Sequence, residues 1–219
     1  MDRKSITWEG PYAWPNFENA EGNEKLKTLP EVEGVYTFTF ELEDGYVAFW
    51  PGYSGTIKTR MDQHRRDKFE KGEYHVFDLE YALKGKRKDI WPWKGNETNP
   101  TGFGSEMQEA VKKQLAATRI FIAKITNEEI SNVQVYGNDN DRKRKRFGKR
   151  LESAFINHLD KETAYWSDLM YKRNKEIGET GMQREDPIWK EEKYGEAPIE
   201  IKNICEYKIY GLPEIFKLY

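Results

Sequence analysis

The stretch from Gly34 to His64 constrains the fold more than any other part of the chain. Residues 35–42 alternate in character, with Tyr36, Phe38, Phe40 and Leu42 on one side and Val35, Thr37, Thr39 and Glu41 on the other. A period of two is typical of a half-buried strand. Asp44-Gly45 is a hairpin turn signal, and residues 46–50 are rich in strand formers up to an expected break at Pro51-Gly52. The stretch therefore predicts a β-hairpin.

A short helical pattern follows the hairpin. Thr56 suits an N-cap, and Arg60 and His64 share one helix face because four residues make about one turn. We expect this face to lie opposite two phenols of the sheet, those of Tyr36 and Tyr53. A compact cluster of cationic and phenolic groups suits a phosphate.

Three further elements are predicted beyond the middle of the chain. Residues 105–119 read as a helix with Ser105 as a possible N-cap, and residues 119–126 read as a third strand. Residues 147–159 carry a helical apolar stripe, made by Phe147, Leu151, Ala154, Phe155 and Leu159. Glu152 lies beside that stripe, and from the sequence alone it could equally be an exposed helix charge.

The order of these features resembles the GIY-YIG nucleases. Gly34-Val35-Tyr36 and Tyr53-Ser54-Gly55 stand for the two triplets, and Arg60, His64 and the later Glu152 follow in the family's order. Members of this family are metal-dependent enzymes that hydrolyse DNA phosphodiester bonds, and some are type II restriction endonucleases. The resemblance implies an α+β fold, with a three-stranded antiparallel sheet flanked by helices and with insertions and a C-terminal extension.

The resemblance also implies a role for each of the five residues. Tyr36 accepts a proton from the attacking water, and Tyr53 hydrogen-bonds the water or the phosphate. Arg60 binds the phosphate with its planar fork of donors, and His64 orients Tyr36 or shuttles a proton. Glu152 holds Mg²⁺, mostly through waters, and Mn²⁺ is expected to substitute.

The strongest charge feature lies just before the predicted Glu152 helix and is called the basic run here. Between residues 142 and 150, seven of nine positions are basic: Arg142, Lys143, Arg144, Lys145, Arg146, Lys149 and Arg150. Such a run is usually a solvated face, but in a chain of net charge −2 a local patch is where phosphates would bind. We interpret the run as a DNA-binding surface.

The segment from 84 to 104 is dense in Gly, Pro and Asn, which predicts a loop or insertion. It holds Lys86, Arg87 and Lys88 close to two tryptophans, Trp91 and Trp93. Basic and aromatic side chains together suit DNA, because cations meet phosphates and rings stack on bases. An ordinary packed loop, with the tryptophans covering the core, is the alternative.

The composition indicates a folded chain and limits the kinds of site that it can hold. Aromatic residues make up 14% of the chain, which argues against disorder. The single cysteine, Cys205, excludes an intramolecular disulfide and a cysteine-based zinc site. Without a signal peptide or a long apolar run, we expect a soluble cytoplasmic protein that does not meet a membrane. The expected partner is double-stranded DNA, and whether the protein acts as a homodimer stays open.

The chain divides on these grounds into three parts. Residues 1–30 are expected to form an irregular aromatic arm, residues 31–161 the nuclease-like core with an insertion at about 68–104, and residues 162–219 an extension packed on the core. Four residues are further candidates for the site without a convincing spacing: Tyr74, His75, Asn157 and Asn174. Two alternatives to a site-specific endonuclease also remain, a non-catalytic nucleic-acid-binding module on the same fold and a repair or mobile-element nuclease.

Overall fold

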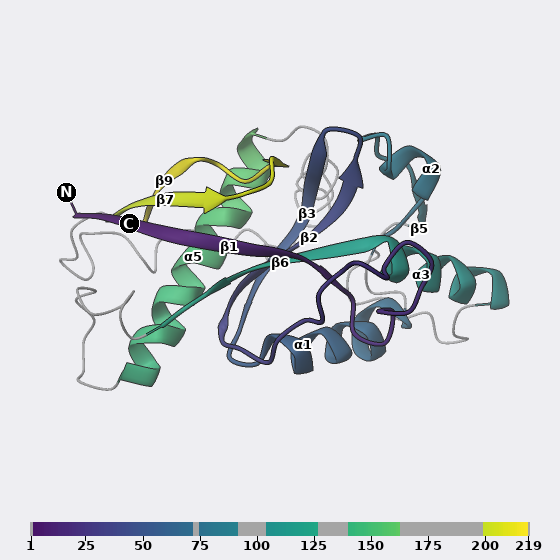
Figure 1. Ribbon diagram of the computed structural model, residues 1–219, viewed down its shortest axis with the longest axis horizontal. Helices are drawn as coiled ribbons and strands as arrows, with labels where there is room; N and C mark the ends of the chain where they lie inside the picture. The colour runs from purple at the N-terminus through teal and green to yellow at the C-terminus, as the bar shows by residue number, and fades with distance from the viewer. Residues whose placement is uncertain (1, 72–74, 92–103, 127–139, 163–198, 219) are drawn as a thin grey trace, which may run out of the picture.

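The protein is an α+β structure built on one seven-stranded mixed sheet (Figure 1). This computed structural model describes residues 2–71, 75–91, 104–126, 140–162 and 199–218. The strands of the main sheet lie in the order β8-β3-β2-β6-β1-β7-β9. Their bounds are β1 Asp2–Ala13, β2 Gly34–Leu42, β3 Gly45–Ser54, β6 Thr118–Lys124, β7 Ile199–Cys205, β8 Ile209–Tyr210 and β9 Ile215–Leu218.

The expected hairpin is present as β2 and β3. Its turn is Glu43-Asp44, because Leu42 pairs with Gly45, one residue earlier than the sequence signal suggested. The expected break at Pro51-Gly52 is wrong, since β3 continues to Ser54. Proline is tolerated there because β8, the neighbour on the other side, pairs with β3 only at Tyr46 and Val47. The missing N–H of Pro51 therefore falls on an unpaired edge.

The N-terminal segment is a strand rather than an irregular arm. β1 runs for 12 residues between β6 and β7. Its pairing with β6 shifts register between Glu9 and Tyr12, around the Gly10-Pro11 dipeptide. A bulge at that point interrupts the alternation, which explains why the sequence reads as irregular. The aromatic residues of this segment pack in the core, since Trp8, Tyr12 and Trp14 are all buried.

Helices cover both faces of the sheet. α1 (Ile57–His64), the π-turn η1 (Arg65–Phe69) and α3 (Ser105–Ala117) lie on one face, and α5 (Asn140–Glu162) lies on the other. Thr56 is the N-cap of α1, as expected, whereas Gly104 rather than Ser105 is the N-cap of α3. Among the described residues, no helix is long and apolar enough to cross a membrane.

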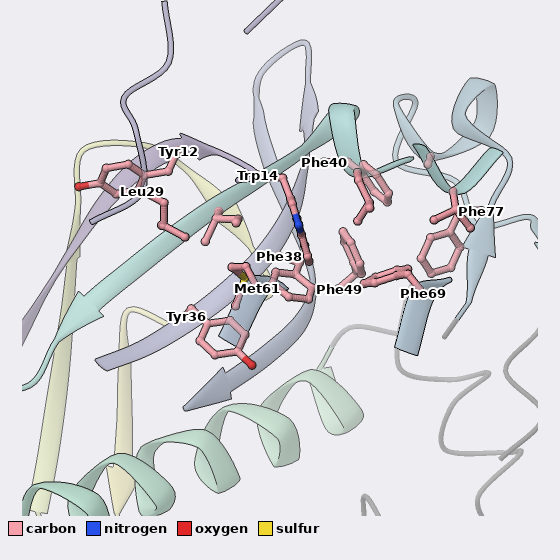
Figure 2. Packing of buried hydrophobic residues seen from close by; sticks show 14 of the residues in the cluster. Tyr12, Trp14, Leu29, Tyr36, Phe38, Phe40, Phe49, Met61, Phe69 and Phe77 are labelled. Atoms are coloured by element: carbon pink, nitrogen blue, oxygen red, sulfur yellow. The ribbon is translucent and has the colours of Figure 1, made fainter. Parts of the chain in front are cut away.

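Each face has its own apolar core. Figure 2 shows the face that α1 covers, where aromatic rings stand in a row along the strands: Tyr36, Phe38, Phe40, Phe49, Phe69 and Phe77. The opposite core packs the predicted stripe of α5 against the sheet, with Phe147, Leu151, Phe155 and Leu159 buried. The alternation of β2 decides this division, because Val35 belongs to the α5 core and Tyr36 to the α1 core.

The segment after η1 contains more regular structure than expected. β4 (Val76–Phe77) pairs with β5 (Asp89–Trp91), and the short helix α2 (Leu79–Ala82) connects them. The expected loop at 84–104 therefore begins with a turn and a strand. Trp91 is partly buried against the α1-side core, as the packed-loop alternative predicts, and Trp93 lies outside the described residues.

Candidate functional site

Tyr36 lies over the backbone of Gly52 on the neighbouring strand. The two residues are paired across β2 and β3. A Cβ atom at position 52 would lie under 3.0 Å from three atoms of the phenol, the hydroxyl oxygen included. Only glycine therefore leaves room for the ring in this position. The Tyr36 side chain is 2% exposed, and Figure 2 shows its hydroxyl at the end of the row of rings, pointing out of the cluster.

The hydroxyl of Tyr36 contacts the imidazole of His64 from α1. The distance from Oη to Nε2 is 2.6 Å, and both groups are buried. Burial, with the positive charges of Arg60 and Lys68, lowers the pKa of His64 to about 3. The imidazole is therefore neutral at pH 7, and one of its nitrogens can accept a hydrogen bond from the phenol.

Two charged side chains act on the same phenol. Burial raises the pKa of Tyr36 well above its usual range, the Arg60 guanidinium opposes this rise, and the Glu152 carboxylate adds to it. Arg60 lies one turn before His64 on α1, and its Nη1 donates to Gln63 Oε1 at 3.1 Å. The phenol that contacts His64 is thus also within electrostatic reach of Arg60 and Glu152.

Tyr53 differs from the expected arrangement. It pairs with Val35 rather than with Tyr36, and it packs with the α5-side core. Its ring lies against Gly148 of α5, where a Cβ atom would come within 3.0 Å of two ring carbons. The two phenols therefore leave opposite faces of the sheet, and the expectation that both face Arg60 and His64 is wrong. Val35, the partner of Tyr53, lies one residue before Tyr36 on β2. Successive side chains of a strand point to opposite faces of the sheet, so Tyr53 lies on the face opposite to Tyr36.

Glu33 is the residue of this site that the sequence analysis did not single out. Tyr53 Oη donates to Glu33 Oε1 at 2.5 Å, and Arg144 Nε donates to Glu33 Oε2 at 2.9 Å. Burial and the Glu33 carboxylate together raise the pKa of Tyr53 well above its usual range. The sequence holds one signal that could have identified Glu33. This residue directly precedes the first triplet, and Tyr53 opens the second.

Glu152 acts electrostatically on both tyrosines. Its charge raises the pKa of both Tyr36 and Tyr53, so it acts on phenols from opposite faces. The Glu152 side chain is 12% exposed, and its Oε2 accepts from Lys149 Nζ at 3.2 Å. We call the set Tyr36, Tyr53, Arg60, His64 and Glu152 the two-tyrosine cluster.

Glu152 is the acidic side chain of this cluster, and a carboxylate oxygen is a donor that Mg²⁺ accepts. Within the described ranges, no group of three or more His, Cys, Asp or Glu is placed to hold one metal ion. Mg²⁺ keeps several waters and commonly takes only one or two carboxylates. A partly exposed Glu152 could supply one such carboxylate.

The basic run lies within α5 rather than before it. Arg142 and Lys145 are exposed, while Lys143, Arg144, Arg146 and Lys149 are half-buried. Arg150 is 3% exposed, so a phosphate contact would require it to leave its position in the fold. Arg144 also binds Asp141, three residues before it on the helix.

The basic residues of the segment after α2 have separate environments. Lys86 is exposed, and Lys88 lies at the surface with Nζ 2.8 Å from Asp78 Oδ2 and over the ring of Tyr81. The Arg87 side chain is 5% exposed and pairs with Asp89. Arg87 is therefore built into the β4–β5 ribbon, whereas Lys86 and Lys88 lie at the surface.

Among the remaining candidates, the structure describes the side chain of His75. His75 lies in the ribbon with Arg87 and Asp89, its Nδ1 3.3 Å from Asp89 Oδ1. Tyr74 and Asn174 lie outside the described residues, as does the side chain of Asn157. Comparisons with protein-family models, curated proteins and solved structures return no match for this chain.

Proposed function

We propose that the protein is a Mg²⁺-dependent DNA endonuclease of the GIY-YIG type, with the site specificity of a restriction enzyme. The observation that carries the proposal is the buried contact between Tyr36 Oη and His64 Nε2, at 2.6 Å. Arg60 and Glu152 act on that same hydroxyl. Phosphodiester hydrolysis needs proton transfer from a water and stabilisation of the charge that develops on the phosphate, and a phenol, an imidazole, a guanidinium and a carboxylate can supply both.

The arrangement of strands supports the same proposal. β3, β2 and β6 are consecutive in the sheet, and the middle strand, β2, runs antiparallel to both neighbours. On this proposal they would correspond to the three-stranded sheet that the resemblance implies. The strands β1, β7, β8 and β9 would then be additions on either side of that core.

Tyr36 would relay a proton rather than act as a preformed phenolate base. Burial disfavours its phenolate, so it can take a proton from water only by passing its own proton on. His64 Nε2 is the acceptor within reach, which requires the neutral tautomer with its proton on Nδ1. A bound phosphate brings negative charge near the imidazole and so makes His64 more basic than in the free protein.

Arg60 and Glu152 would handle the charge of the scissile group. The guanidinium of Arg60 can donate two parallel hydrogen bonds to phosphate oxygens. Glu152 would hold Mg²⁺, mostly through waters. When bound, the ion neutralises charge that develops on the phosphoryl oxygens.

Cleavage of a plasmid library in the presence and absence of Mg²⁺ tests the proposal. We expect Mg²⁺-dependent breaks at a defined sequence, and Mn²⁺ should support them too. Glu152→Gln should abolish cutting and leave DNA binding largely intact. Glu109→Gln, an exposed carboxylate on α3, is the matched control and should cut normally.

Two outcomes separate this proposal from its alternatives. DNA binding without cleavage by the wild-type protein would favour a non-catalytic nucleic-acid-binding module. Cleavage that depends on DNA structure or damage rather than on sequence would favour a repair or mobile-element nuclease. Full activity of a folded Glu152→Gln protein would refute the metal assignment.

A further inference from the structure

We propose that Glu33 is a positioning residue that couples DNA binding to the orientation of Tyr53. This inference rests on the proposed function and adds to it a carboxylate outside the two-tyrosine cluster. Glu33 accepts from Tyr53 Oη with one oxygen and from Arg144 Nε with the other. A single carboxylate thus joins a phenol of the cluster to an arginine of the basic run.

The contact to Tyr53 fixes where the hydroxyl proton points. At 2.5 Å, the phenol donates its only proton to Glu33 Oε1. The lone pairs of Tyr53 Oη are then left to accept from a water, the role expected for this residue. Without Glu33, the hydroxyl could rotate and donate its proton elsewhere. The ring packs closely on the backbone of Gly148, where a Cβ atom would clash with it, so the role that we assign to Glu33 is to orient the proton rather than the ring.

The contact to Arg144 holds a phosphate-binding side chain in the free protein. Arg144 lies between two carboxylates, those of Glu33 and Asp141. The Glu33 and Arg144 side chains are only 22% and 21% exposed, so solvent screens this pair incompletely. DNA must compete with these carboxylates for the guanidinium. Phosphate binding by Arg144 would leave Glu33 with Tyr53 as its remaining described partner, and would strengthen the Tyr53 contact.

The two contacts predict opposite effects on binding and on turnover. Removal of the Glu33 carboxylate should tighten DNA binding, because Arg144 loses a competitor and one negative charge leaves the phosphate surface. The same change should slow cleavage, because Tyr53 loses its acceptor. A residue that only stabilised the fold would lower both affinity and turnover.

Four variants separate these effects. Glu33→Ala should lower KM several-fold and lower kcat by roughly tenfold or more. Glu33→Gln keeps an acceptor for Tyr53 and loses the charge, so it should tighten binding while retaining most of kcat. Asp141→Asn removes the other carboxylate that binds Arg144, does not touch Tyr53, and serves as the control for affinity alone. Glu31→Gln at an exposed neighbour controls for net charge.

A double-mutant cycle decides whether Glu33 acts through Tyr53. With Tyr53→Phe in place, the further change Glu33→Ala should have little additional effect on kcat, since the two groups work as one unit. Additive losses, or weaker DNA binding by Glu33→Ala, would overturn the inference while wild-type cleavage upholds the nuclease proposal. Absence of wild-type cleavage would overturn both. Thermal melting of each variant excludes loss of fold as the cause.

Discussion

His64 should make the protein sensitive to mild acid. In the folded state burial lowers the pKa of His64 to about 3, against about 6.5 in an unfolded chain. Below pH 6.5 the unfolded state therefore binds a proton that the folded state refuses, and the free energy of unfolding falls as the pH falls. This decrease in the free energy of unfolding is absent above pH 6.5 and complete near pH 3.

The size of this effect follows from the pKa difference. Each pH unit within the window costs about 1.4 kcal/mol. At pH 5 the His64 contribution to the free energy of unfolding is thus lower by about 2 kcal/mol, and over the full window by about 5 kcal/mol. A loss of about 5 kcal/mol is comparable to the total stability of many domains, which starts near 5 kcal/mol.

Urea unfolding followed by tryptophan fluorescence at pH 7, 6 and 5 measures the effect. His64→Gln should remove most of the fall between pH 7 and pH 5, whatever its own stability at pH 7. His158→Gln, at a half-buried position on α5, should keep the fall. Parallel pH curves for wild type and His64→Gln would show that the imidazole protonates without penalty, and would refute the reasoning.

Other predictions follow from the cluster and from α5. Arg60→Lys should lower kcat by roughly a hundredfold, because a point charge lacks the planar fork; near-normal cleavage would mean that charge alone suffices. Neutralising the first three arginines of the basic run should flatten the slope of log affinity against log salt by up to about three, and an unchanged slope would make the run solvated surface. Gly52→Ala should destabilise the protein by about 1–3 kcal/mol through its clash with Tyr36. Gly55→Ala, whose Cβ would meet nothing within 4 Å, should melt near the wild-type temperature.

The sequence predicted best those elements whose pattern is local. The alternation of 35–42 predicted β2 correctly, and the four-residue spacing of Arg60 and His64 placed both on one face of α1. The stripe of α5 follows in the same way. In each case the period of the apolar residues matches the period of the element, which is the strongest signal that a single sequence carries.

What the sequence could not predict depends on pairing between distant segments. The faces of Tyr36 and Tyr53 depend on the register of the hairpin, where a shift of one residue exchanges the two faces. Glu33 is an ordinary glutamate until folding places it against Tyr53 and Arg144. β1 was missed because the bulge near Gly10 breaks its alternation. Tertiary structure decides all three features.

The parallel pairing of β1 with β7 sets the order in which the sheet can form. Asp2 pairs with Ile199 and Trp8 with Cys205, and the buried hydrogen bond from Trp8 Nε1 to Asn203 Oδ1 spans 195 residues. Contacts between such distant segments are slow to form. During synthesis, β1 has a partner on one side once β6 is made, but its other edge stays open until residues 199–205 follow. An open strand edge with apolar residues such as Ile6 and Trp8 can pair with other chains and aggregate. We therefore expect β1 to be the strand of this sheet that is exposed to aggregation for the longest time during synthesis.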